Sequence, residues 1–356
     1  MLKKKSLFRV IGMLLTVVLL CGVIAGCSSN SNSGGSSGGD EKFVISASIH
    51  DPAQSVKTIF LKEYAERVFA ATDGQVEMQV FEGGVLAGAG AALEAVTNNT
   101  VDVAWCFSSY FPGQFPLCDV VAQPLMGARD CMQVTNTLWD LWGKYDEMKQ
   151  ELDARYKVLH LYVNPPNTLF FANTEVDSIE KLQGLTLRAA AGTITDILGL
   201  WGANPIFMGP PDVYEALEKG IVDGYCFEFS GMYDFKLFEH TKYYQDMNIY
   251  CGPFLLLMNK DIWDSFPKSV QDKIDSVSGR DCSIEMATVF QNDQDFKKET
   301  VLARSDAVVV NVSPAEYAKF EAIAMQYNAE WAAKNTTSSF DAAAFMADAI
   351  SILAKY

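Results

Sequence analysis

Strand-like and helix-like segments alternate along most of this chain. The first of them are a strand at 43–50, a helix at 56–69, a strand at 75–81, a short helix to about residue 96 and a strand at 101–107. Such alternation predicts parallel strands joined by right-handed crossovers, which is an α/β fold. Ligands bind such sheets at the carboxyl ends of the strands, here near residues 105–110. The helix at 56–69 is expected to bury a face made by Ile59, Phe60, Tyr64, Val68 and Phe69.

The pattern restarts in the second half of the chain. Further strands are predicted at 158–163, 185–188, 205–208, 225–229 and 253–259. Two sheets accommodate so many strands more easily than one, and 356 residues exceed one typical core, so two lobes are expected. Helical spacing over 267–302 predicts a helix of roughly 50 Å that spans both lobes. Another helix is expected from Ser313 and Pro314 to about Asn335.

The first 26 residues have the pattern of an export signal. A basic head precedes an apolar run at 10–20, and Ile24, Ala25 and Gly26 lead to Cys27. These four residues resemble a bacterial lipobox, which would make Cys27 the lipidated first residue of the mature chain. An uncleaved helical anchor is the alternative. Residues 28–39 are only Ser, Asn and Gly, which predicts a flexible tether over 27–40.

The charge of the chain limits its partners. Without the four basic residues of the signal, 24 basic residues face 44 acidic ones, which gives a net charge of −20. Such a surface repels nucleic acid. It also repels small anions, so an acidic ligand requires a local positive group in a cleft.

No motif of enzyme chemistry stands out. The sequence has no G-x-S-x-G, no H-E-x-x-H and no dinucleotide-binding glycine loop, and its histidines are only His50, His160 and His240. We therefore expect a protein that is not an enzyme, with no metal and no cofactor. The mature cysteines are expected to be buried thiols, with one or two disulfides as the alternative. They are Cys106, Cys118, Cys131, Cys226, Cys251 and Cys282.

Four blocks of sequence, in order, resemble the substrate-binding proteins of TRAP transporters, the DctP-like family. They are 63–105, 111–126, 179–188 and 202–224. The resemblance implies a two-lobed, periplasmic-binding-protein-like fold (type II-like), whose lobes are joined by hinge strands and a long spanning helix. It implies lobe I at 41–165 plus 253–292, lobe II at 166–252 plus 293–356, and hinges near residues 165 and 252. The receptor would be a monomer that delivers a small organic acid to TRAP permease membrane subunits.

The resemblance also gives a role to "GLTLRAAAGT", residues 184–193. Family members place an arginine after this glycine, where its planar fork holds the solute's carboxylate, and Arg188 occupies that position. The small residues from Ala189 to Gly192 would let ligand and facing backbone come close. An ordinary surface or interlobe salt bridge is the alternative for Arg188.

Two polar positions of the family pattern differ here. Thr168 stands where some members carry a second arginine, and Phe227, followed by Glu228, stands where the family tends to have asparagine. Aromatic residues are expected in the cleft instead: Trp105, Phe107, Tyr110, Phe170, Phe227 and Tyr233. For each, core packing is the alternative.

One cation among several rings suits a monocarboxylate with an apolar or aromatic body. His50 and Asp51 end the first strand and are expected near the solute. Glu228 is expected to meet a ligand amine or hydroxyl, to pair with Arg188 in the empty cleft, or to be solvated. The rival functions are a receptor for dicarboxylates or other solutes, a solute receptor for a sensor protein, and, least favoured, an exported hydrolase.

Overall fold

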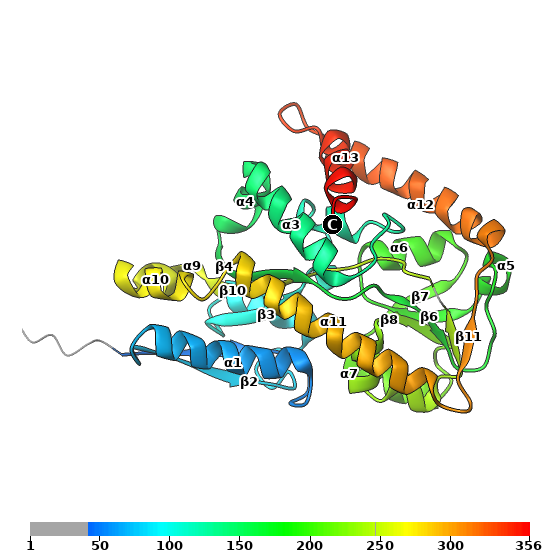
Figure 1. Cartoon of the computed structure of the whole chain (residues 1–356), viewed down its shortest axis with the longest axis horizontal. Coiled ribbons are helices and arrows are strands. Elements are labelled where there is room, and N and C mark those ends of the chain that lie inside the picture. The colour runs from blue at the N-terminus through cyan, green and yellow to red at the C-terminus, as the bar shows by residue number, and fades with distance from the viewer. Residues whose placement is uncertain (1–41, 246) are drawn as a thin grey trace, which may run out of the picture. The chain divides into compact units, whose positions relative to one another are not determined.

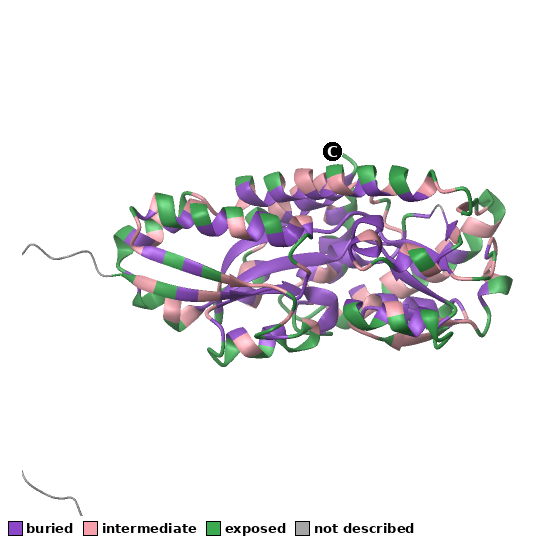
Figure 2. Cartoon of the chain, turned by 90° about the horizontal axis from the view of Figure 1, so that it is seen from below, coloured by how far each residue is buried: buried purple, intermediate pink, exposed green. Residues whose placement is uncertain are grey.

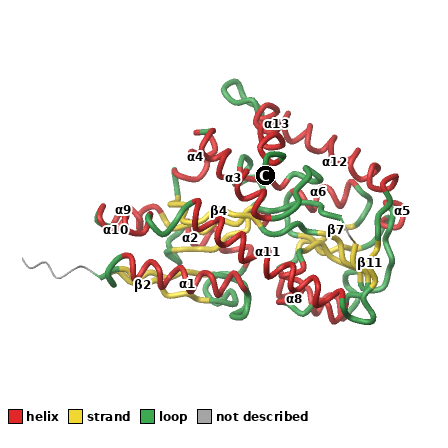
Figure 3. The backbone as a smooth tube through the Cα atoms, viewed as in Figure 1, coloured by secondary structure: helices red, strands yellow, loops and turns green. Residues whose placement is uncertain are grey.

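A computed structural model describes residues 42–245 and 247–356, which belong to one compact unit. The predicted signal, the lipidation site Cys27 and the tether lie outside the described residues. The described part contains two β-sheets with helices around them, as Figures 1 and 3 show. The strands are mostly buried and the helices carry the exposed surface (Figure 2). The α/β class and the two sheets are confirmed.

The first sheet has the strand order β2-β1-β3-β10-β4. Its strands are β1 (Phe43–Ser48), β2 (Val76–Phe81), β3 (Val103–Phe107), β4 (Tyr156–Val163) and β10 (Pro253–Asn259). β1 pairs in parallel with β2 and β3, whereas β10 runs antiparallel to β3 and β4. Every residue of β10 is buried, because its apolar run lies in the interior of the sheet.

The second sheet has the order β11-β9-β5-β8-β6-β7. Its strands are β5 (Thr168–Phe171), β6 (Thr186–Ala189), β7 (Asn204–Phe207), β8 (Gly224–Phe227), β9 (Tyr243–Gln245) and β11 (Val308–Val310). β6 pairs in parallel with β7 and β8, and β5 runs antiparallel to β8 and β9. The short strands β9 and β11 escaped the sequence analysis because three residues carry too little periodicity.

Thirteen α-helices and four 3-10 helices complete the described part. The α-helices are α1 (Val56–Ala71), α2 (Ala92–Thr97), α3 (Cys131–Lys144), α4 (Asp146–Asp153), α5 (Ile179–Leu182), α6 (Thr193–Leu200), α7 (Pro210–Glu218), α8 (Phe229–Asp234), α9 (Lys260–Ser265), α10 (Lys268–Asp275), α11 (Arg280–Leu302), α12 (Pro314–Asn335) and α13 (Ala342–Leu353). The 3-10 helices are η1 (Ala89–Ala91), η2 (Ser108–Tyr110), η3 (Cys118–Ala122) and η4 (Leu237–His240).

The long helix predicted over 267–302 is two helices, α10 and α11. Gly279 separates them with φ of +79°, a left-handed conformation that glycine adopts without steric cost. α11 still contacts elements of both sheets, since it packs on α1, α3 and β4 at one end and on α8 at the other (Figure 1). α12 begins as predicted, with the Ser313 hydroxyl capping the amide of Glu316 and Pro314 in the first turn.

The buried face of α1 differs from the predicted one. Ile59 and Phe69 are 46% and 49% exposed. The predicted Phe60, Tyr64 and Val68 are buried, and Lys57, Thr58, Leu61 and Ala65 complete the buried face at helical spacing. A lysine therefore belongs to an otherwise largely apolar buried face.

Two segments that lie side by side connect the two sheets. Residues 164–167 lead from β4 to β5, and residues 249–252 lead into β10. The amides of Asn164 and Asn167 donate to the carbonyls of Gly252 and Tyr250 at 3.1 and 2.9 Å. The C-terminal α13 packs on α3, beside the first sheet, although the predicted division assigns its residues to lobe II. That division remains a prediction.

Candidate functional site

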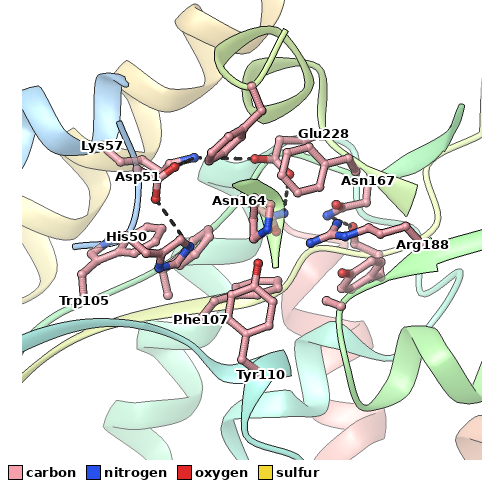
Figure 4. Close-up of a pocket in the computed structure, with 16 residues that line it drawn as sticks. His50, Asp51, Lys57, Trp105, Phe107, Tyr110, Asn164, Asn167, Arg188 and Glu228 are labelled. Atoms are coloured by element: carbon pink, nitrogen blue, oxygen red, sulfur yellow. Dashed lines mark hydrogen bonds and ion pairs between the residues drawn. The ribbon is translucent and has the colours of Figure 1, made fainter. Parts of the chain in front are cut away.

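A cavity lies where the strand ends of both sheets meet the connecting segments (Figure 4). The space between atoms within it is about 350 Å³, a value that includes the part open to solvent. Eight predicted site residues line it: His50, Asp51, Trp105, Phe107, Tyr110, Arg188, Phe227 and Glu228. Ala190, one of the small residues expected close to the ligand, lines it too. The sequence analysis missed the others: Lys57, Asn164, Asn167, Pro210, Phe235, Tyr250 and Phe254.

Arg188 reaches the cavity from β6 and is 1% exposed. Its Nε donates to the carbonyl of Met208 at 3.0 Å and its Nη1 to that of Cys226 at 3.1 Å. The guanidinium carbon lies 4.8 Å from the centre of the Phe227 ring. Nη2 has no hydrogen-bond partner among the described residues. No described carboxylate pairs with the guanidinium, so Arg188 is a buried cation without a counter-ion, and the Tyr110 hydroxyl is a polar side-chain group that interacts with it.

Lys57 is the second cation of the cavity, and carboxylates neutralise it. Its Nζ lies 3.0 Å from Oδ1 of Asp51 and 3.8 Å from Oε1 of Glu228. Burial favours the neutral amine, but the negative charges of Asp51, Glu228 and Asp234 outweigh it and raise the pKa of Lys57. Lys57 is therefore charged and already satisfied.

Glu228 is buried, and its second oxygen accepts from the Asn164 side chain at 3.3 Å. The expectations that it is solvated or pairs with Arg188 are wrong, because Lys57 and Asn164 hold the carboxylate. Asn164 is fixed in turn by the amide of Gly252, which donates to its Oδ1 at 2.6 Å. A side chain at Gly252 would approach the Phe107 ring to 2.4 Å, so glycine permits this close packing.

His50 is neutral in this environment. Burial lowers its pKa to about 4, with Lys57 and Arg188 adding to the shift and Asp51 opposing it. Its Nε2 lies 3.8 Å from Oδ2 of Asp51, and its Nδ1 has no partner among the described residues. Oδ2 of Asp51 likewise lacks a hydrogen bond there.

Aromatic rings form the rest of the wall. Trp105 stacks on Phe254 with centroids 4.1 Å apart, and its indole N–H donates to the Tyr162 hydroxyl. Phe107 packs edge-on against Tyr110 at 5.1 Å. Burial raises the pKa of Tyr110 to about 12, so its hydroxyl, which points into the cavity in Figure 4, stays protonated.

Three aromatic or polar residues expected at the site lie elsewhere. Thr168 and Phe170 share one face of β5, and that face packs on α8 and β9. The Thr168 hydroxyl donates to the carbonyl of Gln245 at 2.7 Å. Phe170 is fully buried in a core with Tyr225, Phe229 and Tyr244, and Tyr233 stacks on Phe238. These residues do not line the cavity, because Phe170 faces the core of the second sheet, Thr168 lines a different cavity and the half-buried Tyr233 packs on Phe238.

The described residues give no sign of a metal site or of a membrane span. Among residues 42–245 and 247–356, no three His, Cys, Asp or Glu side chains gather as metal ligands would. No helix in the same ranges is both long and apolar enough to cross a bilayer. All six cysteines described there are buried free thiols, so no disulfide joins them.

A family model described as bacterial extracellular solute-binding protein, family 7 (DctP), matches residues 47–335. The chain belongs to this family. Its members are the solute-binding proteins of TRAP transporters, which are receptors and not enzymes. The resemblance noted in the sequence is thereby confirmed.

Known proteins resemble this chain in sequence and in fold. The outer membrane transporter protein TsaT of Comamonas testosteroni is 24% identical over 235 residues, 65% of this chain and 69% of TsaT. A TRAP solute-binding protein from a marine metagenome, specific for aromatic acids and solved with 3-hydroxybenzoate, is 24% identical. It covers 89% of this chain and 99% of its own, with a TM-score of 0.79.

A second solved structure, a TRAP solute-binding protein of Rhodoferax ferrireducens, contains copurified benzoate. It is 23% identical and has a TM-score of 0.79, with 88% of this chain and 98% of its own covered. At such identity these likenesses establish the fold alone. The two-lobed architecture expected from the sequence is confirmed by them.

Proposed function

We propose that this receptor binds a small monocarboxylate with an aromatic or apolar body in the cavity and delivers it to the membrane permease of a TRAP transporter. Arg188 is the observation that carries the proposal. Its guanidinium is buried, two of its nitrogens are fixed by carbonyls, and Nη2 is left as a free donor in the cavity. A buried charge without a counter-ion is costly, and a solute carboxylate would remove that cost.

The side chains that line the cavity favour a solute with an apolar or aromatic body. Trp105, Phe107 and Phe254 pack against one another along the cavity, and Phe227 lies against the guanidinium. Such rings provide area for burial and stacking while the single fork sets the orientation of the solute. Two structures with this fold contain 3-hydroxybenzoate and benzoate, which agrees with the proposed class.

The carboxylates of the cavity disfavour the rival class of dicarboxylates. A second solute carboxylate would enter a space where Asp51 and Glu228 already carry negative charge and where Lys57 is their only close counter-ion among the described residues. Thr168, at the place of a second family arginine, does not line the cavity. Like charges brought together in a desolvated site cost several kcal/mol, on the order of 2–5.

Lipid anchoring at Cys27 and delivery to a permease complete the proposal. Cys27 lies outside the described residues, and the lipobox-like sequence before it supports the anchor. A receptor that feeds a sensor protein would use the same cavity. Uptake of labelled solute into cells with and without the candidate permease subunits would distinguish a transport receptor from a sensor receptor. Only the transport receptor requires the permease subunits.

Arg188→Ala tests the proposal. We expect affinity for the solute, measured by isothermal titration calorimetry, to fall about a hundredfold because a charge-assisted pair is lost from a desolvated cleft. The matched control is Arg155→Ala, which removes an exposed arginine that does not line the cavity. The unliganded Arg188→Ala protein should still unfold cooperatively. Unchanged affinity in a folded variant would refute the proposed role of Arg188.

A further inference from the structure

Two residues that line the cavity opposite Arg188 carry buried polar atoms without a partner. Oδ2 of Asp51 and Nδ1 of His50 are buried and have no hydrogen-bond partner among the described residues. Figure 4 shows both side chains on one side of the cavity and Arg188 on the other. A buried polar atom left without a hydrogen bond is costly, so a bound molecule gains by satisfying it.

The environment of His50 determines which of its nitrogens accepts. The neutral ring carries one proton, and Nε2 is the nitrogen that faces Oδ2 of Asp51, 3.8 Å away. The negative carboxylate favours the proton on Nε2, which leaves Nδ1 as a lone-pair acceptor. Both free atoms therefore require a donor.

Lys57 cannot serve as that donor. Its Nζ lies at the other oxygen of Asp51, at 3.0 Å, and also faces Glu228. The ammonium neutralises the Asp51 carboxylate without reaching Nδ1 of His50, for which no contact with Lys57 is found among the described residues. The free acceptors are thus left for the solute.

We propose, building on the proposed function, that the solute carries a hydroxyl group at the end remote from its carboxylate, and that Asp51 and His50 select for that hydroxyl. Arg188 receives the carboxylate at one side of the cavity, and at the other side the O–H donates its single proton to Oδ2 of Asp51 or to Nδ1 of His50. The site is therefore built for hydroxylated monocarboxylates and not for their unsubstituted parents.

The charges and lone pairs of this place distinguish a hydroxyl from a second carboxylate and from an ether. A second carboxylate would be repelled by Asp51 and Glu228 and would offer no proton to His50. A methyl ether has no proton to donate, so its oxygen would face Oδ2 of Asp51 and Nδ1 of His50 as a third acceptor. A hydroxyl offers its one proton to one of these two acceptors and adds no charge.

Matched ligands test the inference on the full-length protein. Calorimetric titrations would compare benzoate, phenylacetate and hexanoate with their hydroxy derivatives, each ring isomer included, and with the corresponding methyl ethers. We expect at least one hydroxy acid to bind about tenfold or more tightly than its parent, and its methyl ether to bind more weakly than the parent.

The variant His50→Phe tests whether this site causes the preference for the hydroxy acid, because it keeps a ring and removes the acceptor. The ratio of parent to hydroxy-acid dissociation constants should fall several-fold towards one. The control His240→Phe changes a histidine outside the cavity and should keep the ratio. Asp51→Asn provides a second test, since its amide tolerates the methyl ether. A ratio compares two ligands on one folded variant, so it is insensitive to a general loss of stability.

The outcomes separate this inference from the proposed function. If parents and methyl ethers bind as tightly as the hydroxy acids, the hydroxyl inference is overturned while the carboxylate receptor stands. A wild-type ratio that His50→Phe and Asp51→Asn both leave unchanged also overturns it. If no monocarboxylate in the series binds, both proposals fail.

Discussion

At the residue scale, the two buried cations of the cavity have opposite roles. Lys57 is matched by Asp51 and Glu228, so it contributes to the folded state without any ligand. Arg188 is held by two carbonyls and has no carboxylate partner among the described residues. The fold thus satisfies one cation and leaves the other as a preorganised site for an anion.

Acid should destabilise the protein through His50. Its pKa is about 4 in the folded chain, against 6.5 for an unperturbed histidine, so between these values the unfolded chain binds more protons. The free energy of unfolding should therefore fall as pH drops from 6.5 to 4, by up to about 3 kcal/mol from this residue. Urea unfolding would measure the free energy of unfolding of wild type and of His50→Phe. Between pH 7 and pH 4 the wild type should lose up to that amount relative to the variant.

The comparison with His50→Phe is needed because other groups act oppositely. Burial raises the pKa values of Asp119 and Glu151 to about 7, so the stability that these protonated carboxyls contribute is lost as pH rises from about 4 to 7. Their contribution cancels between the two proteins. A difference that stays constant over this range would show that His50 is not held neutral in the fold.

The sequence predicted some site residues better than others. Arg188 follows an apolar strand and precedes small residues, and family resemblance gave it a role. Lys57 was missed, although its spacing to Phe60, Leu61 and Tyr64 places it on the buried face of α1. Thr168 and Phe170 were misplaced because the direction in which a strand's side chains point depends on which sheet face carries the helices.

At the element scale, most strands of four or more residues were predicted, although the four-residue β5 was not, and the break between two helices was missed. β10 reads as a continuous apolar run and has the predicted bounds. The break between α10 and α11 depends on Gly279, whose amide donates to the carbonyl of Leu159 in β4 at 2.8 Å. That tertiary contact holds the glycine in a left-handed conformation, which periodicity alone does not reveal.

Gly279→Ala should therefore destabilise the protein although nothing lies within 4 Å of the added methyl group. The cost is conformational, about 1–2 kcal/mol, because φ is +79°. Gly88→Ala serves as the control, since Gly88 has φ of −68° and equally open surroundings. Urea unfolding would measure both. Equal stability of the two variants would contradict this account of the helix break.

At the scale of the whole molecule, the cavity depends on both sheets being close. Lys57 belongs to α1 beside the first sheet and Glu228 follows β8 of the second, so their 3.8 Å contact joins the two. The chain carries a net charge of −16, which repels acids from its surface and leaves their capture to the local field of Arg188. We expect the sheets to move apart about the segments 164–167 and 249–252 when solute leaves.

A crystal structure with the tightest-binding hydroxy acid is the most direct test of the central claim. The account predicts a solute carboxylate within about 3 Å of Nη2 of Arg188. It also predicts that the solute hydroxyl donates to His50 or to Asp51. A solute bound in this cleft with its carboxylate away from Arg188, or bound at another place, would contradict the account.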